Sequence, residues 1–202
     1  MTKVKICGLM DKETVDATCR FGADYIGFVF APSKREVSAE LVRQITKDVP
    51  ATIKKVGVFV SPTIQQLQQT IAIAHLDFVQ IHGDFPTERV DIPMIQAKSV
   101  TNTQNYQTIA DFLLLDAPPK EYHGGNGVMF DWQAVNLNQL PQIPYFVAGG
   151  LRPENVQQAL CYFQPFAVDV SSGVETDGQK DLKKIEQFIN QVKEYDYVST
   201  TR

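Results

Sequence analysis

The feature that most constrains the fold of this chain is a series of eight short apolar runs, each followed by a turn or by apolar residues at helical spacing. The runs are nearly continuous in Val, Ile, Leu and Phe, which is typical of strands covered on both faces. Eight such strands, about 25 residues apart and alternating with helical segments, predict a parallel (β/α)8 barrel. The predicted strands cover residues 4–7, 25–30, 55–60, 78–82, 94–98, 112–116, 145–148 and 166–170.

An open, doubly wound α/β sheet is the alternative architecture. Its dinucleotide-binding form carries Gly-x-Gly-x-x-Gly after the first strand, and the residues after Cys7 lack this spacing. No shift in composition marks a linker, so we expect residues 1–202 to form a single (β/α)8 barrel domain. We expect the polar end of the chain, residues 194–202, to fray.

Capping residues predict where the helices begin. Asp11 and Ser38 each precede an apolar stripe at helical spacing, and Asp181 precedes the last one. Ser61, directly before a proline, predicts the start of a third helix, and Pro153 predicts the start of another. These helices fit the alternation that a barrel requires.

Composition and charge exclude several classes of protein. Hydrophobic residues make up 44% and charged residues 21%, values typical of globular proteins rather than disordered ones. The net charge is −4 and no run of Lys or Arg forms a basic stripe, which argues against a nucleic-acid partner. No apolar segment reaches the ~18 residues that cross a bilayer, and no apolar leader precedes the first strand. We therefore expect a cytoplasmic protein with no membrane partner.

The cysteines and histidines predict neither a disulfide framework nor a metal site. The three cysteines, Cys7, Cys19 and Cys161, show no Cys-x-x-Cys spacing, which fits a reducing compartment. His75 and His123 have no ligand partner at a metal-binding spacing.

Two strand ends carry groups suited to proton transfer. Lys5 and Cys7 alternate with Val4 and Ile6, so they share one face of the first strand, and Cys7 ends it. Asp116 follows four apolar residues, where a carboxyl is costly to bury unless it has a partner or a use. Active sites of such barrels lie at the carboxyl ends of the strands, so these two groups are candidates for a base and an acid on opposite sides of a small ligand. The alternatives are a small core residue at Cys7 and a turn residue at Asp116.

The ends of the last two strands predict a phosphate site. Gly149 and Gly150 follow the seventh strand, and Ser171, Ser172 and Gly173 follow the eighth. Backbone N–H groups and hydroxyls in the loops after these strands commonly bind phosphate in such barrels. Two ordinary glycine turns are the alternative interpretation.

Two further side chains point toward the predicted mouth. Arg35 follows the second strand, where a guanidinium can bind a carboxylate through two parallel hydrogen bonds. An exposed arginine that is only solvated is the alternative interpretation. Gln80 and His82 share the inward face of the fourth strand. His82 is either a ligand contact or a hydrogen-bonded structural residue.

The segments at the strand ends, taken together and in order, resemble the phosphoribosylanthranilate isomerase family of tryptophan biosynthesis. The resemblance extends from residue 3 to about 193, and its most specific parts are the first and last segments. In chain order the segments are KICG (5–8), GFVF (27–30), VGVFV (56–60), QIHG (80–83), LLD (114–116), FDW (130–132), AGGL (148–151) and DVSSGVE (169–175).

The resemblance implies an Amadori rearrangement of N-(5-phosphoribosyl)anthranilate to the 1-deoxyribulose 5-phosphate product without a cofactor. Cys7 would be the general base and Asp116 the general acid, and Arg35 would hold the anthranilate carboxylate. Asp169 would face the sugar hydroxyls. Lys5, on the face of Cys7, would favour the thiolate. The partner would be a small phosphosugar, and the protein a monomer or homodimer.

Two other functions fit parts of the same pattern. An enzyme of the indole-3-glycerol phosphate synthase type would use a catalytic lysine, for which Lys5 and Lys98 are available, but would leave Cys7 and Asp116 without a role. A non-catalytic barrel that binds a phosphorylated ligand would need no acid and base at all.

Overall fold

In a computed structural model of the chain, eight parallel strands form a closed barrel in the order β1 to β8. The structure describes residues 1–99, 108–116, 137 and 140–200. Each strand pairs with its neighbours in sequence, and β1 pairs with β8 to close the ring. The strands are β1 (Lys3–Cys7), β2 (Tyr25–Val29), β3 (Lys54–Val60), β4 (Phe78–His82), β5 (Met94–Ser99), β6 (Phe112–Asp116), β7 (Tyr145–Ala148) and β8 (Ala167–Val170). The predicted barrel is confirmed, with strand bounds that differ from the expected ones by at most one residue.

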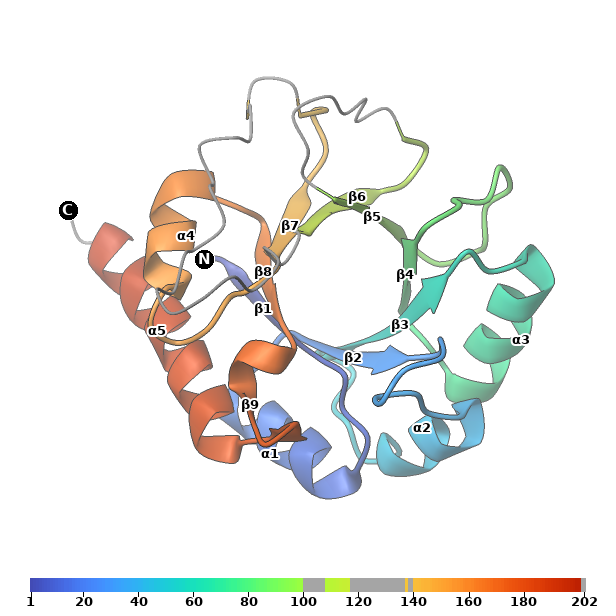
Figure 1. Cartoon of the computed structure of the whole chain (residues 1–202), viewed down its shortest axis with the longest axis horizontal. Helices are drawn as coiled ribbons and strands as arrows, with labels where there is room; N and C mark the ends of the chain where they lie inside the picture. The colour runs from blue at the N-terminus through green and yellow to red at the C-terminus, as the bar shows by residue number, and fades with distance from the viewer. Residues whose placement is uncertain (100–107, 117–136, 138–139, 201–202) are drawn as a thin grey trace.

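The described helices lie on the outside of this barrel, and none of them directly follows β4, β5 or β6 (Figure 1). The C-terminal helix contacts both the first helix and the fourth, so the two ends of the chain meet on one side of the ring. The helices within the described residues are α1 (Lys12–Phe21), α2 (Ala39–Ile45), α3 (Ile64–Ala74), α4 (Val156–Phe163) and α5 (Leu182–Thr200), with a 3-10 turn at Ser172–Val174. After that turn a two-stranded hairpin, β9 (Glu175–Thr176) and β10 (Gln179–Lys180), leads into α5.

Two predicted helix starts are wrong. The N-cap of α3 is Thr63 rather than Ser61, because Thr63 and Gln66 form reciprocal hydrogen bonds that satisfy two backbone N–H groups. Helix α4 begins at Val156, after Asn155, rather than at Pro153. The predicted caps Asp11, Ser38 and Asp181 all accept hydrogen bonds from the first turn of their helices.

The C-terminal segment is also more ordered than expected, because α5 continues to Thr200. Asp196 on this helix accepts hydrogen bonds from the backbone N–H and the hydroxyl of Thr2, just before β1. Tyr195 packs on the core between helices and sheet. The two ends of the chain therefore hold each other in place.

Apolar side chains separate into a layer between sheet and helices and a smaller cluster inside the barrel. The inner cluster is mainly aromatic, with edge-to-face contacts that join Tyr25, Phe78, Phe112 and Phe146. These residues lie at or near the first position of their strands. The amino end of the barrel interior is thus filled with rings, which leaves polar chemistry to the carboxyl end.

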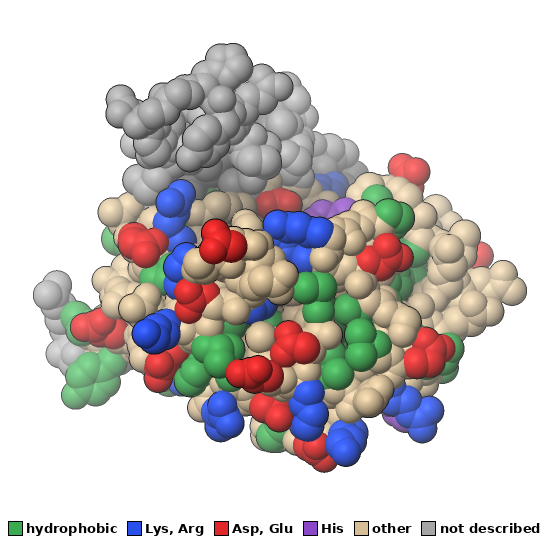
Figure 2. Space-filling view, turned by 60° about the horizontal axis from the view of Figure 1, so that its bottom comes forward, with side chains coloured by type: hydrophobic (Ala, Val, Ile, Leu, Met, Phe, Trp, Pro, Cys, Tyr) green, Lys and Arg blue, Asp and Glu red, His purple; other side chains and the backbone are tan. Residues whose placement is uncertain are grey.

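On the face shown in Figure 2, basic and acidic side chains alternate over the described surface. Among the described helices, none is long and apolar enough to cross a membrane.

Gly173 allows the loop after β8 to lie directly against the loop after β7. A Cβ atom added at Gly173 would lie 1.7 Å from the carbonyl oxygen of Leu151, a backbone atom that cannot rotate away. We expect Gly173→Ala to lower the free energy of unfolding by ~2 kcal/mol or more, since one loop must move. Denaturant unfolding measures this, with Ser172→Ala on the same turn as the control. Equal stability of the two variants would contradict the close approach.

Candidate active site

The carboxyl end of the barrel interior is lined by polar side chains, in contrast to the aromatic side chains at the amino end. Cys7, His82 and Asp116 are the last residues of β1, β4 and β6, and Asp169 is the third residue of β8. The negative charge of Asp169 acts on each of the other three groups, Cys7, His82 and Asp116. The structure therefore places these four predicted site residues in one electrostatic group at the barrel mouth.

A buried ion pair lies at the centre of this group. The Nζ atom of Lys5 lies 2.9 Å from Oδ1 of Asp169, and the two side chains are 0% and 8% exposed. The two residues stand opposite each other in the register of β1 and β8. Burial alone would lower the pKa of Lys5, but Asp169 and Cys7 outweigh it and the net direction is upward, so Lys5 is a cation.

Gly27 on β2 provides the space that Lys5 and Cys7 occupy. A Cβ atom on Gly27 would lie 2.9 Å from Sγ of Cys7 and 3.2 Å from Cε of Lys5. No larger residue fits at this position without moving the thiol. The glycine of the second strand is thus part of the site although it carries no side chain.

Burial raises the pKa of the Cys7 thiol, and the charge of Lys5, which acts in the opposite direction, does not cancel this effect. Lys5 favours the thiolate as expected from the sequence, but the resting group is the thiol. Deprotonation of Cys7 therefore depends on the positive charges around it, which also include Lys180.

Asp116 is tuned toward the protonated form. Burial, followed by the negative charge of Asp169, raises the pKa of Asp116 to about 6. A carboxyl with this pKa can donate a proton near neutral pH, which an ordinary aspartic acid does poorly.

His82 is bonded to its neighbour on the inward face of β4. Its Nε2 atom lies 2.8 Å from Nε2 of Gln80, a buried residue. Burial, followed by the charge of Lys5, lowers the pKa of His82. A neutral imidazole that accepts from the Gln80 amide carries its proton on Nδ1. Both interpretations of His82 left open by the sequence are compatible with this arrangement.

Arg35 lies at the rim of the mouth, where it is paired with Glu175. Its Nε and Nη2 atoms donate to the two carboxylate oxygens of Glu175 at 2.6 and 2.7 Å. Lys180 binds the same carboxylate at 2.9 Å. Burial alone would raise the pKa of Glu175, but the bonds to Arg35 and Lys180 hold it at about 2.

The predicted phosphate loops are built as tight turns after β7 and β8. Gly149 and Gly150 both have positive φ, and the space beside Gly150 is open. The side chain of Asn155 binds the carbonyl of Gly150 and so fixes this turn. On the other side, Lys180 donates to the carbonyl of Ser171 at 2.9 Å.

Several residues of the site were not predicted from the sequence: Gly27, Gln80 in its role toward His82, Glu175 in its role toward Arg35, and Lys180. Glu175 closes the DVSSGVE segment, which was a local signal for its importance. Lys180 stands in a short polar stretch before the last helix, and no pattern there distinguishes it from a solvated lysine.

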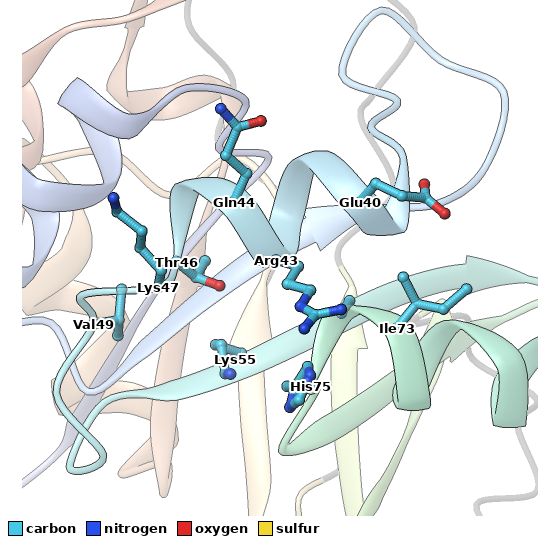
Figure 3. Close-up of a pocket in the computed structure, with 10 residues that line it drawn as sticks. Glu40, Arg43, Gln44, Thr46, Lys47, Val49, Lys55, Ile73 and His75 are labelled. Carbon is cyan, nitrogen blue, oxygen red and sulfur yellow. The ribbon is translucent and has the colours of Figure 1, made fainter.

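A separate groove of about 620 Å³ lies between α2 and α3 (Figure 3). Its charged lining is formed by Glu40 and Arg43 on α2, Lys47 just after that helix, and Lys55 on β3. Lys55 is near the amino end of β3, and none of the predicted site residues lines the groove.

Comparison with known proteins gives one consistent family. Residues 4–191 match the family described as N-(5'-phosphoribosyl)anthranilate isomerase. The chain is 53% identical to the protein of that name from Streptococcus gordonii, over 96% of this chain and 99% of the relative. It is 48% identical to the one from Listeria welshimeri, over 94% of this chain and 98% of the relative.

Solved structures agree with the sequence comparison. A phosphoribosyl anthranilate isomerase crystallised with reduced 1-(o-carboxyphenylamino)-1-deoxyribulose 5-phosphate superposes with a TM-score of 0.81 at 36% identity, covering 96% of this chain and 100% of that one. A monomeric form of the dimeric enzyme from Thermotoga maritima gives 0.80 at 35% identity, covering 96% and 99%. With its closed barrel and its polar carboxyl end, the chain belongs to the N-(5'-phosphoribosyl)anthranilate isomerase family.

Proposed function

We propose that this protein catalyses the Amadori rearrangement of N-(5'-phosphoribosyl)anthranilate, a step of tryptophan biosynthesis, with Cys7 as general base and Asp116 as general acid. The observation that carries the proposal is the pairing of a buried thiol on β1 with a carboxyl of raised pKa on β6, both in the field of one ion pair. Family membership supports the reaction, and the geometry supports the assignment of roles.

In the first step the Asp116 carboxyl donates its proton to the furanose ring oxygen. The bond from C1′ to that oxygen breaks, and the nitrogen lone pair forms a C1′=N bond, so the ring opens to a protonated Schiff base. The raised pKa of Asp116 keeps a fraction of the group protonated near neutral pH.

In the second step the Cys7 thiolate removes the proton from C2′. The electrons of that bond form C1′=C2′ while the C1′=N electrons return to nitrogen, which gives an enolamine. Transfer of the hydroxyl proton from C2′ to C1′ then produces the ketone. The substrate nitrogen donates its electron pair in the first step and takes it back in the second, so the chemistry needs no cofactor.

Other residues would hold the substrate across the mouth. Arg35 would bind the anthranilate carboxylate, and the two loops would bind phosphate through Gly149, Gly150, Ser171, Ser172 and Gly173. Asp169 would face the sugar hydroxyls, with His82 near them. The turn after β8 and Arg35 both lie beside the end of β1, because a Cβ atom added at Gly8 would lie 2.6 Å from Cδ of Arg35 and 3.1 Å from Oγ of Ser171.

The wider setting of the protein is part of the same proposal. We infer that the chain forms one domain, is cytoplasmic and acts as a monomer or a homodimer. Its three free cysteines fit the reducing conditions of the cytoplasm. The indole-3-glycerol phosphate synthase type is not favoured, because the relatives carry the isomerase name and Cys7 and Asp116 would have no role in that chemistry.

The reaction predicts a large loss of turnover on removal of either proton-transfer group. We expect Cys7→Ala and Asp116→Ala each to lower kcat by ~10²-fold or more, the size of a general acid–base contribution. Decay of the anthranilate fluorescence of the substrate with purified protein measures it, and Cys19→Ser is the control thiol variant on α1. A kcat near that of the wild type in either alanine variant would remove that residue from the mechanism.

The raised pKa of Asp116 predicts a stability difference that depends on pH. Its pKa is about 6 in the fold against an ordinary 3.8, so its contribution to stability is fully present below about 3.8 and is lost as the pH rises through about 6. Asn does not titrate. The stability of Asp116→Asn relative to wild type should therefore increase by about 2.5 kcal/mol between about pH 4 and about pH 7.5. Denaturant unfolding at both pH values measures this, and a difference that does not change with pH would contradict the raised pKa.

The charge of Lys5 predicts the reactivity of Cys7. Removing it should raise the pKa of the thiol and slow alkylation by iodoacetamide near pH 8 by about tenfold, the effect of one pKa unit on thiolate concentration. The measurement uses Lys5→Met in a Cys19→Ser, Cys161→Ser background.

Lys3→Met is the matched control, because Lys3 is an exposed lysine of the same strand paired with Asp24. The variant Lys5→Met with Asp169→Asn leaves no unpaired buried charge. Its alkylation rate is measured instead if the single variant does not fold. Alkylation as fast as in Lys3→Met would show that Lys5 does not act on the thiol.

A further inference from the structure

Arg35 is held by one edge of its guanidinium group. Glu175 accepts from Nε and from Nη2, which is the side edge of the planar group. An arginine has five N–H donors, and the end edge, formed by Nη1 and the second hydrogen of Nη2, is still able to form a two-bond fork. Among the described residues no hydrogen bond to Nη1 of Arg35 is found. A carboxylate ligand can therefore bind the end edge while Glu175 keeps the side edge.

Glu175 is itself fixed from three sides. Its side chain is 6% exposed and receives Lys180, whose own side chain is 4% exposed, at 2.9 Å. Lys180 pairs with Glu175 in the register of the β9–β10 hairpin. The backbone carbonyl of Glu175 accepts from Lys184 of α5 at 2.7 Å. The carboxylate is thus a rigid support rather than a mobile surface group.

The local charge favours a second anion at this place. Arg35 and Lys180 both bind the single carboxylate of Glu175, and Lys34 lies 3.9 Å from it. Positive charge therefore exceeds negative charge around Glu175. A ligand carboxylate would reduce this imbalance.

Arg35, which carries part of this excess positive charge, lies next to the mouth of the barrel. Its Cδ atom would lie 2.6 Å from a Cβ atom on Gly8, the residue that follows Cys7. After the bond to Glu175, the negative charge of a Cys7 thiolate also helps to raise the pKa of Arg35. The guanidinium consequently lies over the end of β1, where the ligand must be.

We propose that Glu175 is a positioning residue, which holds the side edge of Arg35 so that the end edge is presented to the aromatic carboxylate of the substrate. The proposal rests on the proposed function, because it takes the substrate carboxylate as the group that Arg35 binds. It makes Glu175 a determinant of specificity for carboxylate-bearing substrates without contact to the reacting atoms.

The test compares two ligands on a set of variants. The probes are reduced 1-(o-carboxyphenylamino)-1-deoxyribulose 5-phosphate and the same compound without the ring carboxylate, and the readout is the ratio of their Kd values. We expect Glu175→Gln to lower the preference for the carboxylated probe by about tenfold, with little change for the other. Arg35→Ala should abolish the preference, and adding Glu175→Gln to it should cause no further change.

Asp177→Asn is the matched control. Asp177 is an exposed acid at the tip of the same hairpin, and its positive φ of 52° suits Asn. Glu175→Asp is the second variant if Glu175→Gln does not fold: it keeps the charge but is too short to hold both nitrogens, so it should also lower the preference. In steady-state assays Glu175→Gln should raise KM more than it lowers kcat.

The outcomes separate this inference from the proposed function. Equal weakening of both probes by Glu175→Gln, or a stronger preference for the carboxylate, would overturn the positioning role while the wild-type enzyme still turns over its substrate. Absence of turnover in the wild type, or a full carboxylate preference in Arg35→Ala, would instead overturn the proposed function.

Discussion

The barrel depends on one buried ion pair across its seam. Lys5 on the first strand and Asp169 on the last stand opposite each other and are almost completely buried. Removal of one partner of such a pair leaves a buried charge without compensation, which typically costs ~3–5 kcal/mol. The pair therefore links the two strands that close the ring to the charge pattern of its polar end, and neither charge can be removed alone without this cost.

This ion pair also influences the pKa values of the two groups proposed for proton transfer. The negative charge of Asp169 raises the pKa of Cys7 and of Asp116, while Lys5 acts in the opposite direction on both, and burial exceeds either effect. Both groups are consequently biased toward the neutral form. This bias suits an acid at Asp116, but it opposes formation of the thiolate that a base at Cys7 requires. The cations around Cys7 are the part of the structure that makes the thiolate accessible.

The sequence predicted the barrel and the position of its polar end for a simple reason. Near-continuous apolar runs identify strands buried on both faces, and a parallel barrel brings all their carboxyl ends to one side, so Cys7 and Asp116 follow from strand ends alone. The role of Asp169 came from the family resemblance instead. Contacts between loops have no such periodicity. Arg35 and Glu175 are 140 residues apart, and nothing in either segment predicts that the two side chains pair. The start of α3 was missed for a smaller reason, since Ser61 and Thr63 are both good caps and only the bond to Gln66 decides between them.

The loop after β8 connects the two ends of the proposed ligand site. The ammonium of Lys180 donates to the carbonyl of Ser171, in the loop proposed for phosphate, and to the carboxylate of Glu175, which holds Arg35. One buried cation thus links the group that would bind the phosphoryl end to the group that would bind the aromatic acid. Because Lys180 cannot shift toward one partner without weakening its bond to the other, the spacing between the two anchors is fixed by the fold. A rigid spacing of this kind would select a ligand by its length as well as by its charges.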